Sequence, residues 1–242
     1  MVYKWLFNTL SRLWPAHCYL CQQATHHAGI CAACRHDLPV VVQGCQRCGV
    51  SLAGPGANAV CAACLKEAPP YDRVVSALAY TAPVSHLITG LKFHDRLHYA
   101  PLLAQLLFER LGVGPVSVQA IVPVPLHQRR LRERGFNQAL EIARPLAAAL
   151  GIPVLTDTLV RVRETAPQSL QHARGRHTNV HNAFAVSGTP AYQHIALLDD
   201  VMTSGHTAGE AARCLRQAGV ETIEIWCAAR ASTHAESTPA KF

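Results

Sequence analysis

Four C-x-x-C pairs between residues 18 and 64 constrain the fold of this chain more than any other feature of its sequence. The pairs read CYLC, CAAC, CQRC and CAAC. The two sulfurs of one pair can bind a single metal ion, and two pairs complete a tetrahedral zinc site. The four pairs therefore predict two structural Zn²⁺ ions. The predicted ligands are Cys18, Cys21, Cys31, Cys34, Cys45, Cys48, Cys61 and Cys64.

Two other uses of paired cysteines agree less well with the sequence. Disulfide bonds need an oxidising compartment, and the sequence shows no export signal; a thioredoxin-like dithiol needs one pair, not four in succession. The interval around the cysteines has little apolar periodicity, so it needs metal to stay folded. We expect a small double zinc-ribbon module over residues 18–68, with the first two pairs on one ion because sequential pairing closes shorter loops.

Downstream of residue 71, segments with the apolar pattern of strands alternate with segments of helical periodicity. This alternation predicts an α/β domain over residues 71–230, with a mainly parallel sheet and flanking helices. We expect Pro145 to kink the helix in which it lies or to end its first part early. The expected strands lie near 71–80, 119–126, 154–162, 183–186, 194–201 and 221–229. One short helix is expected to end near residue 92, and further helices are expected over 100–111, 137–150 and 207–218.

The two ends of the chain differ from its centre in composition. Apolar residues at helical spacing predict a short helix over residues 1–17, whereas residues 231–242 are small and polar, and we expect them to be disordered. No segment has the length of a membrane span, so we expect a cytoplasmic protein without one. The net charge of +7 comes mainly from arginine, whose planar guanidinium suits anionic partners.

The stretch IALLDDVMTSGHT, residues 195–207, places two aspartates and a hydroxyl-rich turn after a buried strand. Ligands of parallel sheets bind beyond the carboxyl ends of the strands, where helix N-termini favour anions. The turn can bind a phosphate, while Asp199 and Asp200 must face hydroxyl groups or a metal ion. A sugar phosphate with Mg²⁺ is the expected ligand. The expected phosphate-binding residues are Thr203, Ser204, Gly205, His206 and Thr207.

This stretch resembles the phosphoribosyl diphosphate (PRPP) motif of type I phosphoribosyltransferases. The resemblance implies a type I phosphoribosyltransferase-like sheet. It also implies that Asp199 and Asp200 hold the ribose hydroxyls of PRPP while residues 203 to 207 hold its 5-phosphate.

Two further stretches, VPVPLHQRRLRERGFNQA and RVRETAPQSLQHARGRHTNVHNAF, together with the cysteine pairs, resemble the ComF family of competence-associated proteins and in particular its GntX-like DNA-utilisation branch. The resemblance covers roughly residues 18 to 230. It implies that Lys92 and Arg134 act with the two aspartates in catalysis, and that Arg130 and Arg176 bind PRPP. The second stretch resembles the mobile loop that closes over PRPP in phosphoribosyltransferases.

The sequence leaves two classes of function open. One is a phosphoribosyltransferase, a pentosyl-transferring enzyme that displaces pyrophosphate from C1 of the ribose in favour of an unidentified acceptor. The other is a non-catalytic zinc-containing adaptor that takes part in uptake, processing or utilisation of DNA. PRPP, single-stranded DNA and DNA-uptake or recombination proteins are the candidate partners. DNA binding rests on the resemblance, because aromatic residues make up 6% of the chain and only Tyr19 lies among the cysteine pairs.

Overall fold

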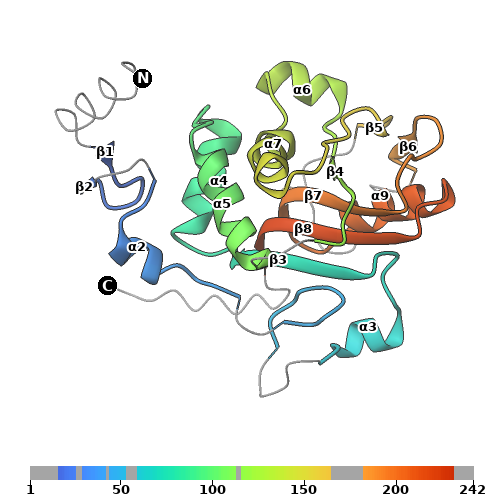
Figure 1. The fold of residues 1–242 in the computed structure, drawn as a ribbon, viewed down its shortest axis with the longest axis horizontal. Helices are drawn as coiled ribbons and strands as arrows, with labels where there is room; N and C mark the ends of the chain where they lie inside the picture. Colours follow the sequence, from blue (N-terminus) through green and yellow to red (C-terminus); the bar gives the residue numbers. More distant parts are fainter. Residues whose placement is uncertain are drawn as a thin grey trace.

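The computed structural model describes residues 16–25, 29–41, 44–52, 59–112, 116–164 and 182–231. A parallel sheet of four strands in the order β3-β8-β7-β4 forms the centre of these residues (Figure 1). This arrangement confirms the α/β fold class. The strands are β3 (Arg73–Ala79), β4 (Ala120–Pro123), β7 (His194–Met202) and β8 (Thr222–Arg230).

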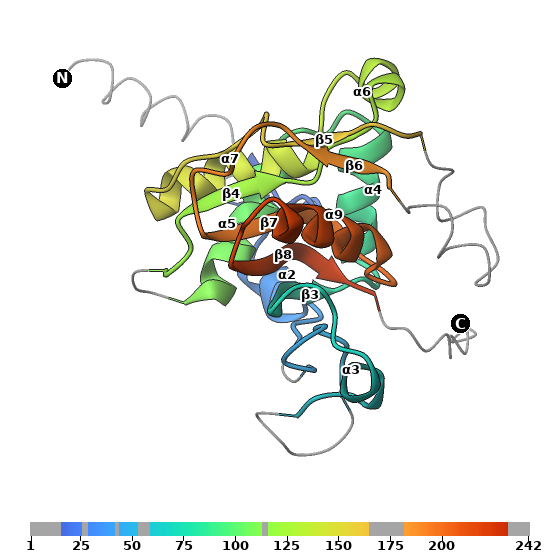
Figure 2. The same cartoon turned by 90° about the vertical axis from the view of Figure 1, so that its right-hand side faces the viewer.

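Helices cover both faces of the sheet. Alternate residues of a strand point to opposite faces, and because the buried strands are apolar at successive positions, both faces need to be covered. In β7, Ala196 and Leu198 pack with helices α4, α5 and α7, whereas Ile195 and Leu197 pack with helix α9 (Figure 2). Each face thus has its own apolar core. The helices are α4 (Val84–Phe93), α5 (Tyr99–Leu111), α7 (Gln138–Leu150) and α9 (His206–Gln217).

Helix α7 corrects the prediction made for Pro145. The helix runs without a break from Gln138 to Leu150, with Pro145 inside it. The loss of one main-chain hydrogen bond at a proline costs about 3 kcal/mol. Here Ile142 and Leu146, both essentially unexposed, pack into the core on either side of the proline, and this burial offsets the cost.

The strand predicted near 154–162 is also corrected. Val154 makes a single bridge to Ile121, and the chain then leaves the main sheet. Strand β5 (Leu159–Arg161) pairs instead with β6 (Phe184–Val186) in a separate antiparallel ribbon beyond β4. The arginine-rich segment 128–134, for which no helix was predicted, forms the short helix α6 (Gln128–Arg134).

The cysteine pairs lie in two small segments beside the α/β domain (Figure 1). In the first, Tyr19 packs against the rings of His98 and Tyr99, and Arg35 forms a 2.7 Å ion pair with Glu109 of α5. In the second, Gly49 packs against Val74 of β3. Their elements are β1 (Ala16–His17), β2 (Ala24–Thr25), α2 (Ala32–His36) and α3 (Ala62–Lys66).

The predictions for the two ends of the chain fall largely outside the described residues. Ala16 and His17 form strand β1, so the helix predicted over residues 1–17 does not reach its expected end. Residues 1–15 and 232–242 lie outside the described part of the chain. Among the helices of the described part, none is long and apolar enough to cross a membrane.

Candidate functional site

The two aspartates lie where the neighbouring strand β4 stops. β4 ends at Pro123, opposite Leu198, while β7 continues as far as Met202 beside β8. Asp199 and Asp200 therefore lie within β7 instead of at its end, one step beyond the last paired residue of β4. Because successive residues of a strand point to opposite faces, the two carboxylates lie on different faces of β7.

The Asp200 carboxylate is buried and held by two side chains from the helices of one face. Its Oδ2 lies 2.5 Å from Nζ of Lys92, near the end of α4, and its Oδ1 accepts a 3.4 Å hydrogen bond from Nε2 of Gln138. Asp200 is 2% exposed, so this charge needs its cation. The structure thus brings together Lys92 and Asp200, which the sequence separates by more than one hundred positions.

The carboxyl group of Asp199 titrates in an unusual range. Burial is the largest influence, and with the nearby charge of Asp200 it raises the pKa of Asp199 to about 8, although Lys92 acts in the opposite direction. Burial alone would lower the pKa of Lys92, but the Asp200 carboxylate beside it raises this pKa above its ordinary value. The site therefore holds one buried ion pair, Lys92 with Asp200, and one carboxyl group, Asp199, whose pKa lies near neutral pH.

The RGFNQ stretch forms the turn that carries Gln138 to the aspartates. Gly135 ends α6 with a φ of 83°, and Asn137 caps α7 by accepting from the N–H of Ala139. Asn137 Nδ2 also donates to the carbonyl of Val124, 3.1 Å away, which ties the start of α7 to the end of β4. Gln138 Oε1 in turn accepts a 2.6 Å hydrogen bond from Arg134. The sequence analysis gave Gln138 no role, although it lies in the quoted motif.

The arginines of α6 and β5 differ in the charged groups that surround them. Arg129 forms ion pairs with Glu133 and Glu164, away from the aspartates. The pKa values of Arg134 and Arg161 are both lowered, mainly by burial and further by the charge of Arg130. A nearby carboxylate opposes each shift: Asp200 acts on Arg134, and Asp199 acts on Arg161. Arg134 and Arg161 are therefore close enough to Arg130 and to one of the two aspartates to feel their charges, and the roles predicted for Arg130 and Arg134 in binding and catalysis stay predictions.

The expected phosphate-binding turn connects β7 to helix α9. Gly205 has a φ of 83° and precedes the first helical residue, His206. A Cβ at this position would lie 2.8 Å from Met202 Cε and 3.3 Å from Tyr71 Oη, so the close neighbours and the positive φ both favour glycine here. Ser204 Oγ lies 2.8 Å from His206 Nδ1. The first-turn N–H groups of a helix have no partner within that helix, which makes this end of α9 suited to an anion.

Arg176 lies outside the described residues, as does the rest of the segment 165–181. The described residues contain a cavity of about 760 Å³ between the second cysteine segment and the first half of β3. Its lining includes the predicted zinc ligand Cys45, together with Gly49 and Val74, but none of the residues expected to bind PRPP. The site is therefore defined by the side chains around Asp199 and Asp200, not by this cavity.

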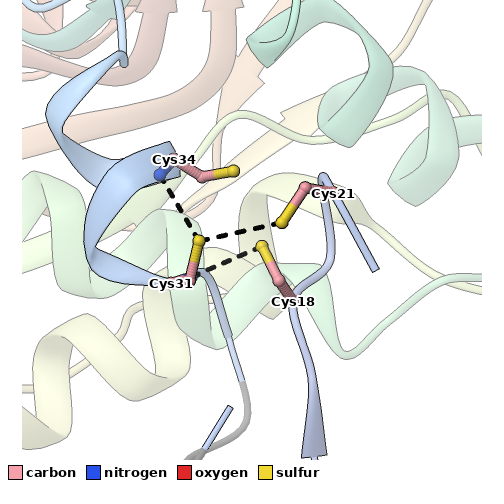
Figure 3. Close-up of side chains that lie close together, drawn as sticks. All are labelled: Cys18, Cys21, Cys31 and Cys34. Atoms are coloured by element: carbon pink, nitrogen blue, oxygen red, sulfur yellow. Dashed lines mark hydrogen bonds between the residues drawn. The ribbon is translucent and has the colours of Figure 1, made fainter. Parts of the chain in front are cut away.

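The eight paired cysteines form two separate clusters, one from each pair of neighbouring motifs, which confirms the sequential pairing. Figure 3 shows the first cluster, in which the side chains of Cys18, Cys21, Cys31 and Cys34 lie close together. Within each cluster the four sulfurs lie within 4.8 Å of one another. Sulfurs held tetrahedrally at about 2.3 Å from zinc are about 3.8 Å apart. The Sγ atoms of Cys21 and Cys31, and those of Cys48 and Cys61, lie 3.7 Å apart. Two structural zinc ions fit these sites.

Main-chain N–H groups around one sulfur of each cluster favour the thiolate that zinc requires. Burial acts to raise the pKa of Cys18, but hydrogen bonds from the main chain of Cys21 and Cys31 lower it to about 6. In the second cluster, the main chain of Cys48 and Cys61 lowers the pKa of Cys45 to about 6 in the same way. The two remaining cysteines are different: Cys227 is buried, with a pKa raised to about 12, and Cys214 is half-buried, in agreement with core thiols.

Comparisons with known proteins give the family. A DNA utilization protein, YhgH, from Salmonella typhimurium is 39% identical over 223 residues, which cover 89% of this chain and 97% of the relative. Competence protein F from Haemophilus influenzae is 34% identical over 224 residues, covering 88% and 96%. The chain belongs to the YhgH/ComF family. The family's double zinc ribbon is also found directly, since the model of the double zinc ribbon domain matches residues 9–65. The family assignment from the sequence is thereby confirmed.

Two solved structures show distant similarity to this member of the family. The glutamine PRPP amidotransferase from B. subtilis, 19% identical, gives a TM-score of 0.37 over 53% of this chain and 26% of its own. Adenine phosphoribosyltransferase from Leishmania donovani, 12% identical, gives 0.31 over 72% of this chain and 92% of its own. These scores are too low to fix the fold, which rests on the strand order and register described above.

Proposed function

We propose that this YhgH/ComF family member binds PRPP with Mg²⁺ beside Asp199 and Asp200, and that it takes part in the utilisation of DNA in the cytosol. The observation that carries the proposal is the buried ion pair between Lys92 and Asp200, next to a second carboxyl group and a helix N-terminus. A buried charge pair of this kind costs desolvation energy, and such groups gather at functional sites.

The groups around the aspartates match the parts of PRPP. The positive charge of Mg²⁺ bound with PRPP favours the ionised form of Asp199, so that the carboxylates of Asp199 and Asp200 accept hydrogen bonds from ribose hydroxyls in the complex. The turn before α9 offers N–H and hydroxyl donors to the 5-phosphate. Lys92, Arg130 and Arg134 supply positive charge for the diphosphate. Mg²⁺ bound with PRPP neutralises part of the diphosphate charge and suits oxygen ligands.

The same residues support transfer chemistry if an acceptor binds nearby. Departure of pyrophosphate from C1 leaves positive charge on the ribose, which the carboxylates stabilise, while Lys92 and Arg134 stabilise the leaving diphosphate. This phosphoribosyltransferase activity is the second candidate function. Release of pyrophosphate from PRPP in the presence of nucleobases, nucleotides or DNA would establish it, and its absence with a protein that binds PRPP would favour the adaptor.

The DNA component of the proposal comes from the names of the relatives and from the basic charge. Tyr19, the aromatic residue noted among the cysteine pairs, packs against His98 and Tyr99, so its ring is engaged within the protein. A stacking platform on the first cysteine segment is therefore not supported. Filter binding of labelled single strands tests direct contact: affinity that falls steeply with salt indicates phosphate contacts, and its absence assigns the DNA role to protein partners.

A thermal-shift panel tests the ligand. PRPP with Mg²⁺ should raise the melting temperature of the zinc-loaded protein, because a ligand at about 100 times its Kd adds about 2.7 kcal/mol of stability. Ribose 5-phosphate or pyrophosphate alone, each carrying part of the molecule, should raise it less. Equal shifts for all three compounds would indicate a general anion site and contradict the proposal.

A further inference from the structure

Arg230, the last residue of β8, is buried and connects the second cysteine segment to the phosphate-binding turn. Its Nε donates a 2.9 Å hydrogen bond to the carbonyl of Cys48. Its Nη1 lies 3.0 Å from the carbonyl of Met202 and 2.7 Å from that of Ala231, and it also contacts the carbonyl of Thr203. One side chain with 4% exposure therefore joins a predicted metal ligand to the start of the turn.

The chemistry of this contact fixes main-chain positions. All four of these partners are carbonyl oxygens, and the planar guanidinium holds its donors in a rigid arrangement. A displacement of the Cys48 carbonyl would leave a buried donor unsatisfied unless Arg230 moved with it. The carbonyl of Thr203 would then lose the donor that Arg230 supplies, and the carbonyl of Met202 would keep only the N–H of Ala231. The geometry around the second metal site is thus coupled to the geometry of the turn.

The chain that follows the second cysteine segment makes a further contact with the turn. Tyr71 is buried, and its hydroxyl lies 3.3 Å from the position that a Cβ at Gly205 would take. Pro70 lies against Gly209 in the first turns of α9. The second segment therefore supports the phosphate-binding turn both through Arg230 and through the residues that lead into β3.

The first cysteine segment lies elsewhere. Its charged and aromatic contacts with the α/β domain are made at α5 and its N-cap, through Arg35 with Glu109 and through Tyr19 with His98 and Tyr99. The residues that follow it pair with the end of β3, where Val40 forms a bridge with Leu78. None of these residues belongs to the candidate site. The two metal sites are therefore not equivalent in their relation to the phosphate-binding turn.

We propose that Arg230 is a positioning residue, through which the metal site of Cys45, Cys48, Cys61 and Cys64 sets the conformation of the phosphate-binding turn. The first metal site has no such role. The effect on ligand affinity rests on the proposed function, since PRPP is the ligand assigned to the turn. The conformation of the turn itself does not depend on that assignment.

A matched pair of cysteine variants tests the coupling without any ligand. In Cys64→Ser, amide hydrogen exchange of residues 203–207 should become faster than in the wild type, whereas in Cys21→Ser it should stay unchanged. Exchange in β4 and in the first half of β7 reports whether the domain remains folded. Equal exchange of the turn in both variants, with the sheet protected, would overturn the proposal; if Cys64→Ser loses the sheet, the arginine variants decide.

Substitutions of Arg230 test the same link while the cysteines stay intact. Arg230→Gln should keep its full zinc content, increase exchange of residues 203–207 and weaken PRPP binding on the order of tenfold, within the usual range of coupling between sites. Arg230→Lys, which retains charge but not the planar donors, should fall between Gln and wild type. Arg144→Gln, an exposed arginine of α7 paired with Glu141, serves as the control and should leave both readouts unchanged.

The outcomes separate this proposal from the assignment of PRPP. If wild-type protein does not bind PRPP but the turn exchanges faster in Arg230→Gln, PRPP is refuted as the ligand and the coupling through Arg230 is supported. If wild-type protein binds PRPP and Arg230→Gln shows unchanged affinity and unchanged exchange of the turn, the coupling through Arg230 is refuted and PRPP is supported as the ligand.

Discussion

The ammonium of Lys92 lies 2.5 Å from the Asp200 carboxylate, with side-chain exposures of 23% and 3%. Neither charge is tolerated alone at such a depth, because a buried ion without its partner keeps its full desolvation cost. The pair therefore links stability to the candidate site. In the proposed complex, Lys92 remains beside Asp200 while its charge also faces the diphosphate.

Removal of one partner should destabilise the protein more than removal of both. Lys92→Met should lower the free energy of unfolding by about 3 to 5 kcal/mol, the usual cost of leaving one ion of a buried pair unpaired. Lys92→Met combined with Asp200→Asn should recover most of this loss. Urea denaturation of the two variants and of wild type measures the difference. A double variant less stable than Lys92→Met would contradict the assignment of a buried pair.

The raised pKa of Asp199 predicts a pH dependence of stability. The folded protein keeps this group protonated up to a pKa of about 8, while the unfolded chain ionises near the ordinary aspartate pKa of 3.8. The unfolded state therefore binds fewer protons between these values, and the contribution of Asp199 to stability falls as pH rises, by at most about 1.4 kcal/mol per pH unit. Below the lower value this contribution is fully present.

Asp199→Asn isolates that contribution. Its amide keeps an oxygen to accept the 2.9 Å hydrogen bond from the N–H of Asp200 but does not titrate. Between pH 6.5 and 8 the unfolding free energy of wild type should fall relative to that of the variant as pH rises, by at most about 1.4 kcal/mol per pH unit. Parallel curves would show that Asp199 has an ordinary pKa.

Gly205→Ala should weaken PRPP binding as well as stability. The substitution forces a positive φ on a residue with a side chain and places its Cβ 2.8 Å from Met202 Cε. Gly151→Ala is the matched control, because Gly151 has a φ of 69° but no atom within 4 Å of an added Cβ. Both variants should lose about 1 kcal/mol from backbone strain. Only Gly205→Ala should lose more and lower PRPP affinity, which chemical denaturation and titration would measure.

Metal analysis tests the cysteine clusters. Purified, untagged protein should contain about two equivalents of zinc, and Cys21→Ser or Cys64→Ser should each reduce this to about one, because each belongs to a different tetrahedral site. A wild-type content well below two equivalents would contradict the two-zinc assignment. Loss of both ions in a single variant would show that the sites fold as one unit.

The parts of the fold that the sequence predicted are those with strong local signals. The C-x-x-C spacing gave the zinc ligands, and the apolar runs gave β4, β7 and β8 because strands buried on both faces are continuously apolar. The prediction for Pro145 was wrong because tertiary packing of α7 outweighed the local cost of proline. The strand predicted near 154–162 was right only for its last part, β5, and its pairing was not predicted because its hydrogen-bond partner, β6, lies more than twenty residues downstream.

In the candidate site, too, the residues with a strong local signal were predicted and the others were not. Asp199 and Asp200 stood out because adjacent carboxylates after a buried strand are unusual. Gln138 and Arg230 did not, since a glutamine at the start of a helix and an arginine at the end of a strand are ordinary in sequence. Their roles depend on contacts across 62 and 182 positions, which no local pattern contains.

The most direct test of the central claim is calorimetric titration of zinc-loaded protein with PRPP in the presence of Mg²⁺. Asp199→Asn serves as the site variant, and Asp157→Asn, an exposed carboxylate outside the site, as its matched control. Saturable binding is expected for wild type and for Asp157→Asn, and binding at least about tenfold weaker, or 1.4 kcal/mol, is expected for Asp199→Asn. Absence of binding by folded wild type, or equal binding by all three proteins, would contradict the proposed PRPP site.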